Sequence, residues 1–461
     1  MFTPFDALAS TFYTFIVLLN AVSTYSAVYI HPEKFPQIWL VLDIFACNSA
    51  EQPLQILAIK AVFVYVIFFM GGFRFTLTHL MYYLDLVTMA GLVYLFSESN
   101  QAKKVIEQAS KTWIVEARNS SPSTLTLYGL LTAALYTPTV RPRIPFLPSF
   151  SVAHGTCLNS LSPHSPFRFN AVGYVTYEEG LDAVKSTGDS SQLQKLVLDV
   201  FVHKNVKAQV ETEGLRPVLL YVHGGGWRMG SKDIRDPLMK RLVTRSHWVV
   251  VSIDYRISAA NAYPAHLIDV KRAIRWTKRT VSFFGGDPSF IFVAGHSAGG
   301  HLAAMAALTQ NDRRYQPGFE TEDTTVRAVV SLNGALQLHE PPARAEWFIR
   351  NICNGQADAA FLRDHSPVAL VEKKEMSRVP FLVISGERDA VIAVKVGEHF
   401  WAAYERAAVG SPRILPTGDC HHLVVPGAHH SFHLFWSPRA FYASVAVERW
   451  LNHAYDVMKG K

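Results

Sequence analysis

The sequence has few charged side chains, few cysteines and no long run of basic residues. Charged residues make up 18% of its 461 residues, against roughly 25% in an ordinary soluble domain. Hydrophobic residues make up 49%, which excludes an intrinsically disordered chain. The net charge of +7 is dispersed along the chain, so we do not expect a nucleic-acid-binding surface.

Motifs for metal and nucleotide binding are also missing. The four cysteines stand far apart and form no CxxC pair, which excludes a zinc ribbon and a disulfide framework. Neither the phosphate loop G-x-x-x-x-G-K-[ST] nor the dinucleotide motif G-x-G-x-x-G occurs. We therefore expect neither a metal ion nor an organic cofactor.

Long apolar stretches are concentrated near the N-terminus. Ala7–Ile30 contains no charged residue, Leu54–Phe73 is interrupted only by Lys60, and Thr76–Phe96 contains Asp85. Roughly 20 apolar residues in a helix cross a bilayer, so we expect about three transmembrane helices rather than core helices of a soluble domain. Lys60 and Asp85 should face each other inside the bundle or extend toward its surface.

The residues beside these stretches bear on membrane topology. Only Asp6 precedes the first stretch, so we expect an uncleaved span and not a signal peptide. Basic residues follow the third stretch and favour a cytosolic C-terminal side: Lys103, Lys104, Lys111 and Arg118. Asn119 begins a glycosylation sequon, which would matter on a luminal side. We expect an integral membrane protein, of the endoplasmic reticulum membrane in a eukaryote.

Composition divides the chain into three parts. Residues 1–120 form the predicted membrane anchor, and residues 121–194, which are rich in proline, form a predicted linker and cap segment. Short apolar runs such as Val218–Val222 and Phe290–Ala294 alternate with helical stretches in residues 195–461. This alternation predicts an α/β domain with a mostly parallel sheet covered by helices on both faces.

The first of three candidate site motifs surrounds Ser297. The segment Gly295–Gly299 reads G-x-S-x-G and lies between a predicted strand and a helix of small residues. A serine on such a sharp turn exposes its hydroxyl, and the flanking glycines let the strand and helix approach closely. The following helix N-terminus would face a developing oxyanion. Ser297 is therefore a candidate nucleophile.

The second motif is a glycine triplet. His223–Trp227 reads His-Gly-Gly-Gly-Trp and ends the predicted strand Val218–Val222. Consecutive glycines are conformationally costly, so the position must need bare amides or positive φ angles. Such amides suit the negative oxygen of a tetrahedral intermediate.

The third motif supplies an acid and a base. Asp389 follows the apolar run Phe381–Ile384, and His430 follows the run Leu423–Val425. A histidine would take the proton of Ser297, and an aspartate would orient that histidine. Two alternatives stay open from the residues, Glu387 as the acid and His429 as the base. Neighbouring histidines without cysteine or carboxylate partners do not indicate a metal site.

Four separated motifs together resemble the hormone-sensitive-lipase-like branch of the α/β-hydrolase superfamily. They are His223–Trp227, Asp254–Arg256, Gly286–Pro288 and Gly295–Gly300. This branch includes bacterial carboxylesterases and the membrane-anchored arylacetamide deacetylases, and the chain order Ser, Asp, His is that of α/β-hydrolases. The resemblance spans about residues 195–455 and implies the α/β-hydrolase fold.

The resemblance also implies roles for individual residues. It makes Ser297 the nucleophile, Asp389 the acid and His430 the base. It assigns the oxyanion hole to the backbone amides of Gly225, Gly226 and Ala298. His223 and Gly224 are the first two residues of the His-Gly-Gly-Gly motif. The chain departs from the family pattern at His296, where an acidic residue is common, and in its several apolar stretches where one is usual.

These observations predict a membrane-anchored serine carboxylesterase or lipase that hydrolyses lipophilic carboxylic esters. Trp227, Tyr255 and Phe432 are candidate pocket residues near its site. The expected partners are a small ester and the lipid bilayer. An amidase or deacetylase with the same triad is the alternative, and a non-catalytic membrane adaptor is disfavoured because the motifs are intact.

Overall fold

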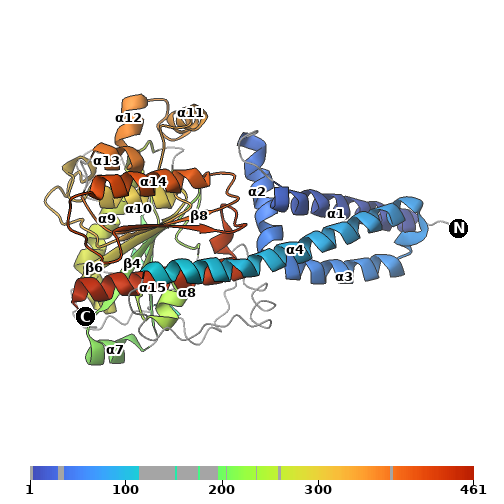
Figure 1. Cartoon of the computed structure of the whole chain (residues 1–461), viewed down its shortest axis with the longest axis horizontal. Helices are drawn as coiled ribbons and strands as arrows, with labels where there is room; N and C mark the ends of the chain where they lie inside the picture. Colours follow the sequence, from blue (N-terminus) through green and yellow to red (C-terminus); the bar gives the residue numbers. More distant parts are fainter. Residues whose placement is uncertain are drawn as a thin grey trace.

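The computed structural model describes a helical bundle and an α/β unit that lie end to end (Figure 1). Residues 4–29, 36–113, 151–152, 175–176, 196–203, 205–234, 236–257, 261–373 and 377–460 are described. Almost all of the predicted linker and cap segment, with Arg118 and Asn119, lies outside these residues.

The bundle contains the predicted apolar stretches. Its helices are α1 (Pro4–Tyr29), α2 (Pro36–Glu51), α3 (Pro53–Phe69) and α4 (Thr76–Trp113), with the short 3-10 helix η1 (Gly72–Arg74) before α4. Within the described chain, α1 and α4 are each long and apolar enough to cross a membrane. The second part of α2 and α3 form a pair bent by 89°, which would count as a third span.

A buried ion pair lies inside the bundle. Nζ of Lys60 contacts Oδ1 of Asp85, and both side chains are almost fully buried, which confirms the expectation that these two residues face each other. The hydroxyl of Tyr13 donates to Oδ2 of Asp85 at 3.2 Å. Pairing removes the large cost of an isolated charge in hydrocarbon.

A mostly parallel sheet forms the centre of the α/β unit, as predicted. Its order is β1-β3-β5-β4-β6-β7-β8-β9, with β2 also paired to β3. Neighbours from β5 to β9 are parallel, whereas β3 runs antiparallel to β5. The strands are β1 (Ser151–Val152), β2 (Val175–Thr176), β3 (Val197–Val202), β4 (Arg216–Val222), β5 (Val249–Ile253), β6 (Gly286–His296), β7 (Val329–Leu332), β8 (Phe381–Gly386) and β9 (Cys420–Val425).

Helices cover both faces of this sheet (Figure 1). Alternate strand residues explain the two layers, because Leu220 packs in one buried cluster and Leu219 in the other. One face carries α9 (Ala265–Thr280), α10 (Ala298–Leu308), α13 (Pro367–Lys373) and α14 (Val394–Ala408). The other carries α8 (Pro237–Arg245), α15 (Pro438–Lys459) and the end of α4. The remaining helices are α7 (Val206–Glu213), α11 (Pro342–Asn351) and α12 (Ala359–Asp364), with the short 3-10 helices η4 (Val281–Phe284), η5 (Arg313–Tyr315) and η6 (Phe432–Leu434).

Helix α4 belongs to both parts of the molecule. The third apolar stretch was expected to end at Phe96, but the helix continues to Trp113. Its C-terminal part places Ala102, Ile106 and Trp113 in the buried cluster under the sheet. Hydropathy predicted only the apolar part of α4. The residues after Phe96 form an amphipathic helix, with polar residues on one face and core residues on the other, so their mean hydropathy is low.

Candidate active site

Ser297 lies on the turn that joins β6 to α10. Its backbone has φ +55° and ψ −116°, a region that non-glycine residues rarely adopt. The N–H of Ser297 donates to the carbonyl of Leu332 at 2.9 Å. A Cβ at Gly299 would lie 2.1 Å from the carbonyl oxygen of Val222. The glycine is therefore required for the close approach of α10 to β4.

A continuous chain of hydrogen-bond contacts starts at Ser297. Nε2 of His430 lies 2.9 Å from Oγ of Ser297, and Nδ1 of His430 lies 2.7 Å from Oδ2 of Asp389. The other carboxylate oxygen of Asp389 accepts from the N–H groups of Val391 at 2.8 Å and Ile392 at 2.7 Å. The structure therefore brings together the three residues that the sequence reading selected, from loops after β6, β8 and β9.

The charge environment favours a basic His430. Burial lowers the pKa of His430, but the charge of Asp389 and its hydrogen bond raise it, and the net result is a pKa above the ordinary value. His296 lies beside His430, and its Nε2 donates to the carbonyl of His430 at 3.1 Å. Burial holds the pKa of His296 well below its usual range and lowers that of His433 to about 3. Both rings are therefore neutral neighbours of His430.

The glycine motif turns at the end of β4. Gly225 has φ +130° and Gly226 has φ +59°. A Cβ at Gly225 would lie 2.0 Å from the carbonyl oxygen of Met229, whereas one at Gly226 would find nothing closer than the Trp347 ring at 3.9 Å. The backbone is therefore open at Gly226. The N–H of Ala298 is the first of α10 and has no partner within the helix.

His223 and Tyr255 support this loop from below. Nδ1 of His223 donates to the carbonyl of Gly224 at 2.8 Å, and the two rings stack with centroids 4.3 Å apart. The Tyr255 hydroxyl donates to the carbonyl of His223 at 3.0 Å. Burial lowers the pKa of His223 to about 4, so its ring stays neutral. These contacts give His223 and Tyr255 a supporting role.

The alternative acid and base lie elsewhere. Nδ1 of His429 lies 3.2 Å from Oδ1 of Asp43, and its Nε2 lies 3.3 Å from the carbonyl of Ala27. Both partners belong to the bundle. Oε2 of Glu387 accepts from the N–H of Gly427 at 2.8 Å. In the described part of the chain, no group of three or more His, Cys, Asp or Glu residues could hold a metal ion.

The candidate pocket residues occupy packed positions. Trp227 is buried against Phe348, with ring centroids 4.9 Å apart. Phe432 is fully buried in the cluster on the α15 face of the sheet. The open apolar side chains near the glycine motif are Met229 and Trp347, which are 66% and 42% exposed. Sequence reasoning did not select these two, because Met229 follows the glycine motif and Trp347 lies in α11, far from it in the sequence.

Asn333 is a further residue that sequence reasoning missed. It follows β7 with φ +47°, and its Oδ1 accepts from the N–H of Gly386 at 2.8 Å. Its Nδ2 donates to the carbonyl of His430. Asn333 thus joins the end of β8 to the loop that carries His430. A polar residue directly after a buried strand, at the edge that carries the other motifs, was the available signal.

Asn333→Ala is expected to lower the free energy of unfolding by about 1–3 kcal/mol, because the buried N–H of Gly386 loses its acceptor. It should also lower kcat, because the His430 loop loses a contact. Urea unfolding and steady-state ester hydrolysis measure the two effects. Asn311→Ala is the matched control, since Asn311 also has a positive φ and accepts from the Thr324 N–H at 2.8 Å. Equal kcat values for the two variants would contradict the expectation.

Comparison with known proteins shows a similarity to one family over part of the chain. Residues 198–404 match the model of the BD-FAE family. This part of the chain is therefore similar to the BD-FAE family. The matched residues include the parallel strands β4 to β8 with Ser297 and Asp389, whereas His430 follows them.

Several curated proteins that are similar to this chain are named as ester hydrolases. The probable carboxylic ester hydrolase LipM of Mycobacterium tuberculosis is 35% identical over 255 residues, which cover 54% of this chain and 57% of LipM. Esterase LipC of the same organism is 36% identical over 267 residues, covering 56% of this chain and 62% of LipC. Arylacetamide deacetylase of Bos taurus is 39% identical over 103 residues, 22% of this chain and 26% of that protein. The chain thus spans about three fifths of the length of these two bacterial relatives.

Proposed function

We propose that the protein is a membrane-anchored serine esterase that hydrolyses lipophilic carboxylic esters. The observation that carries the proposal is the contact chain from Ser297 through His430 to Asp389, beside an open glycine loop. The names of its relatives support an ester substrate. A non-catalytic adaptor would have no use for this aligned set of residues.

The geometry supports acyl transfer to water. Oγ of Ser297 attacks the ester carbonyl while Nε2 of His430 takes its proton, and Asp389 stabilises the resulting imidazolium. The N–H groups of Gly225, Gly226 and Ala298 are the proposed donors to the oxyanion. The alcohol leaves with the proton from His430. Water then attacks the acyl-enzyme by the same steps, releasing the acid and restoring Ser297.

The surroundings of the site favour lipophilic substrates. Met229 and Trp347 expose apolar surface beside the glycine loop, and the bundle has helices that could cross a bilayer. We propose that this bundle is inserted in a membrane, which would be the endoplasmic reticulum membrane if the protein is eukaryotic. The hydrolase then lies on the cytosolic side, since Lys103, Lys104 and Lys111 follow the apolar part of α4.

A chemical labelling experiment tests the serine esterase directly. The full-length protein in detergent should hydrolyse p-nitrophenyl esters, and a fluorophosphonate reagent should stop the reaction by modifying Ser297, as located by mass spectrometry. An optimum across acyl chain lengths would give the size of the acyl pocket. Hydrolysis that survives the reagent would contradict the proposal. Activity on aryl amides alone would favour the deacetylase alternative.

Activity is expected to depend on the protonation of His430. Its raised pKa means that the proton remains bound to a higher pH than on an ordinary histidine, and protonated His430 cannot accept the proton of Ser297. kcat/KM should therefore fall as pH decreases through a value above the ordinary histidine pKa. A pH profile of kcat/KM, corrected for spontaneous hydrolysis, measures this limb. A midpoint below the ordinary value would contradict the expectation.

A further inference from the structure

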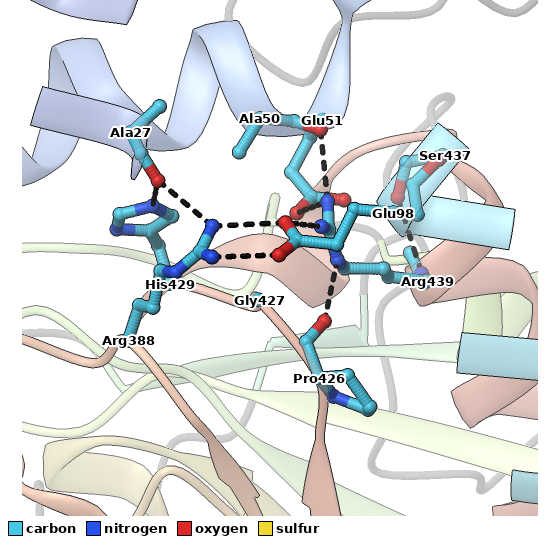
Figure 2. A network of polar contacts seen from close by, with 12 residues as sticks. Ala27, Ala50, Glu51, Glu98, Arg388, Pro426, Gly427, His429, Ser437 and Arg439 are labelled. Carbon is cyan, nitrogen blue, oxygen red and sulfur yellow. Dashed lines mark hydrogen bonds and ion pairs between the residues drawn. The ribbon is translucent and has the colours of Figure 1, made fainter. Parts of the chain in front are cut away.

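Residues next to two members of the proposed triad bind the helical bundle (Figure 2). Arg388 precedes Asp389 in the chain and makes a two-pronged contact with Glu98 of α4. The distances are 2.8 Å from Nη1 to Oε2 and 2.6 Å from Nη2 to Oε1. Nη1 of Arg388 also donates to the carbonyl of Ala27, in α1, at 3.1 Å. The loop after β8 is therefore held by two bundle helices.

The loop after β9 is held by the same part of the bundle. His429 precedes His430, and its Nε2 lies 3.3 Å from the carbonyl oxygen of Ala27. The same oxygen accepts the hydrogen bond from Arg388. Its Nδ1 lies 3.2 Å from Asp43 of α2. One carbonyl at the end of α1 thus contacts both loops.

A second arginine strengthens the junction. Arg439, at the start of α15, is fully buried, and its Nη2 donates to Oε2 of Glu98 at 2.9 Å. Nη1 donates to the carbonyl of Ala50 at 2.9 Å and to Glu51 at 3.2 Å, both in α2. Nε donates to the carbonyl of Pro426 at 2.7 Å, in the loop after β9. Figure 2 shows Glu98 between Arg388 and Arg439.

These contacts require a defined geometry. Bidentate arginine–carboxylate contacts are directional, and removing one partner at a buried site leaves an unpaired charge, which is strongly destabilising. Glu98 approaches the backbone so closely that a Cβ at Gly427 would lie 2.4 Å from its Oε2. A covalent tether alone would need none of these contacts.

We propose that the helical bundle is a positioning element of the active site as well as a membrane anchor. Through Glu98 and Asp43, the bundle holds Arg388 and His429, and so fixes the loops that carry Asp389 and His430. The inference rests on the proposed function, because it assigns the bundle a part in the same reaction. Glu98 and Asp43 are positioning residues and do not contact the reacting atoms.

Glu98→Gln tests the proposal in the full-length protein. Arg388 loses its charged partner and Arg439 keeps only Glu51. kcat for p-nitrophenyl ester hydrolysis should fall about tenfold or more, since a misplacement of ~1 Å in a site can cost roughly 100-fold. KM should change much less, and Glu98→Asp should recover part of kcat. Hydrogen–deuterium exchange should become faster in residues 386–392 and 426–433.

Glu448→Gln provides the matched control. Glu448 in α15 pairs with Arg241 of α8 and accepts from the Ser246 hydroxyl at 2.6 Å. Its side chain is 8% exposed, close to the 12% of Glu98. This control removes an arginine–carboxylate pair that joins two helices and includes no residue of either triad loop. Its kcat and the exchange of both loops should stay at wild-type values.

Asp43→Asn is a second test with a readout specific to His430. The charged groups that act on His430 are Asp389, Asp43 and Arg344, while His296 and His433 beside it are neutral. The Asp43 carboxylate raises the pKa of His430, so its loss should shift the acid limb of kcat/KM to lower pH. A purely structural contact would lower activity without this shift.

The outcomes separate the positioning role from the proposed function. Wild-type kcat, pH profile and loop exchange in both Glu98→Gln and Asp43→Asn would overturn the positioning role. If Glu98→Gln does not fold, the pH profile and loop exchange of Asp43→Asn decide. If the wild type shows no hydrolysis or labelling that depends on Ser297, the esterase proposal fails. Loop exchange still tests the positioning role in that case.

Discussion

Ser297→Ala is expected to reduce kcat for p-nitrophenyl ester hydrolysis by at least about 10⁴-fold, because the variant cannot form an acyl-enzyme. Residual activity would come from the glycine amides and from substrate binding. Hydrolysis by the detergent-solubilised variant and wild type, measured across acyl chain lengths, gives the ratio. Thermal unfolding should show similar stability for the variant and the wild type, since within the described residues the substitution removes only the contact between Oγ of Ser297 and Nε2 of His430.

Ser331→Ala is the control for loss of a buried serine hydroxyl. Ser331 lies in β7, directly beside Gly295 of β6, but outside the proposed triad. Its variant should retain activity within a few-fold of wild type. Equal hydrolysis by Ser297→Ala and the wild type would exclude Ser297 as the nucleophile, and with it the proposed mechanism.

Asp389→Asn is expected to lower kcat by roughly 10³–10⁴-fold. The N–H groups of Val391 and Ile392 both point at Oδ1, so the amide oxygen of the new asparagine must take that position. Its NH₂ group then faces Nδ1 of His430. Nδ1 must accept this hydrogen bond, which places the ring proton on Nε2. His430 can then no longer take the proton of Ser297.

Glu387→Gln separates this effect from a general loss of carboxylate near the site. Glu387 lies two residues away and accepts from the N–H of Gly427, so its amide variant should keep kcat within about tenfold of wild type. Single-turnover hydrolysis with a limiting amount of ester compares the acylation rates of the two variants. A larger loss in Glu387→Gln than in Asp389→Asn would favour Glu387 as the acid.

Local sequence patterns were sufficient for much of the fold and the proposed triad. Gly295–Gly299 and His223–Trp227 each follow a continuous apolar strand, and a parallel sheet brings the ends of its strands to one edge. Asp389 and His430 could be selected because they also follow such strands. Local patterns left His429 open as the base, and the choice of His430 rested on the family resemblance. The structure places His430 between Ser297 and Asp389, and His429 against Asp43 of the bundle.

Contacts distant in sequence were beyond local patterns. Glu98 meets Arg388 across a separation of 290 residues, and no periodicity or motif connects them. Trp227, Tyr255 and Phe432 were selected because they adjoin the motifs, but sequence proximity does not distinguish a side chain that lines open space from one that supports a loop. The extension of α4 beyond Phe96 was also missed, because its few apolar residues are spaced for contact with the sheet and do not form a continuous apolar stretch. These residues pack in the core under the sheet.

The continuity of α4 limits how this protein can be divided and recombined. One helix supplies exposed apolar residues at its start, Glu98 at the junction, and Ala102 and Trp113 in the core beneath the sheet. Removal of residues 1–120 would remove these core side chains together with Glu98, the partner of Arg388. Exchange of the anchor for an unrelated transmembrane helix would have the same defect. The anchor and the hydrolase are therefore expected to be inherited together, with residues on the two sides of the junction changing in concert.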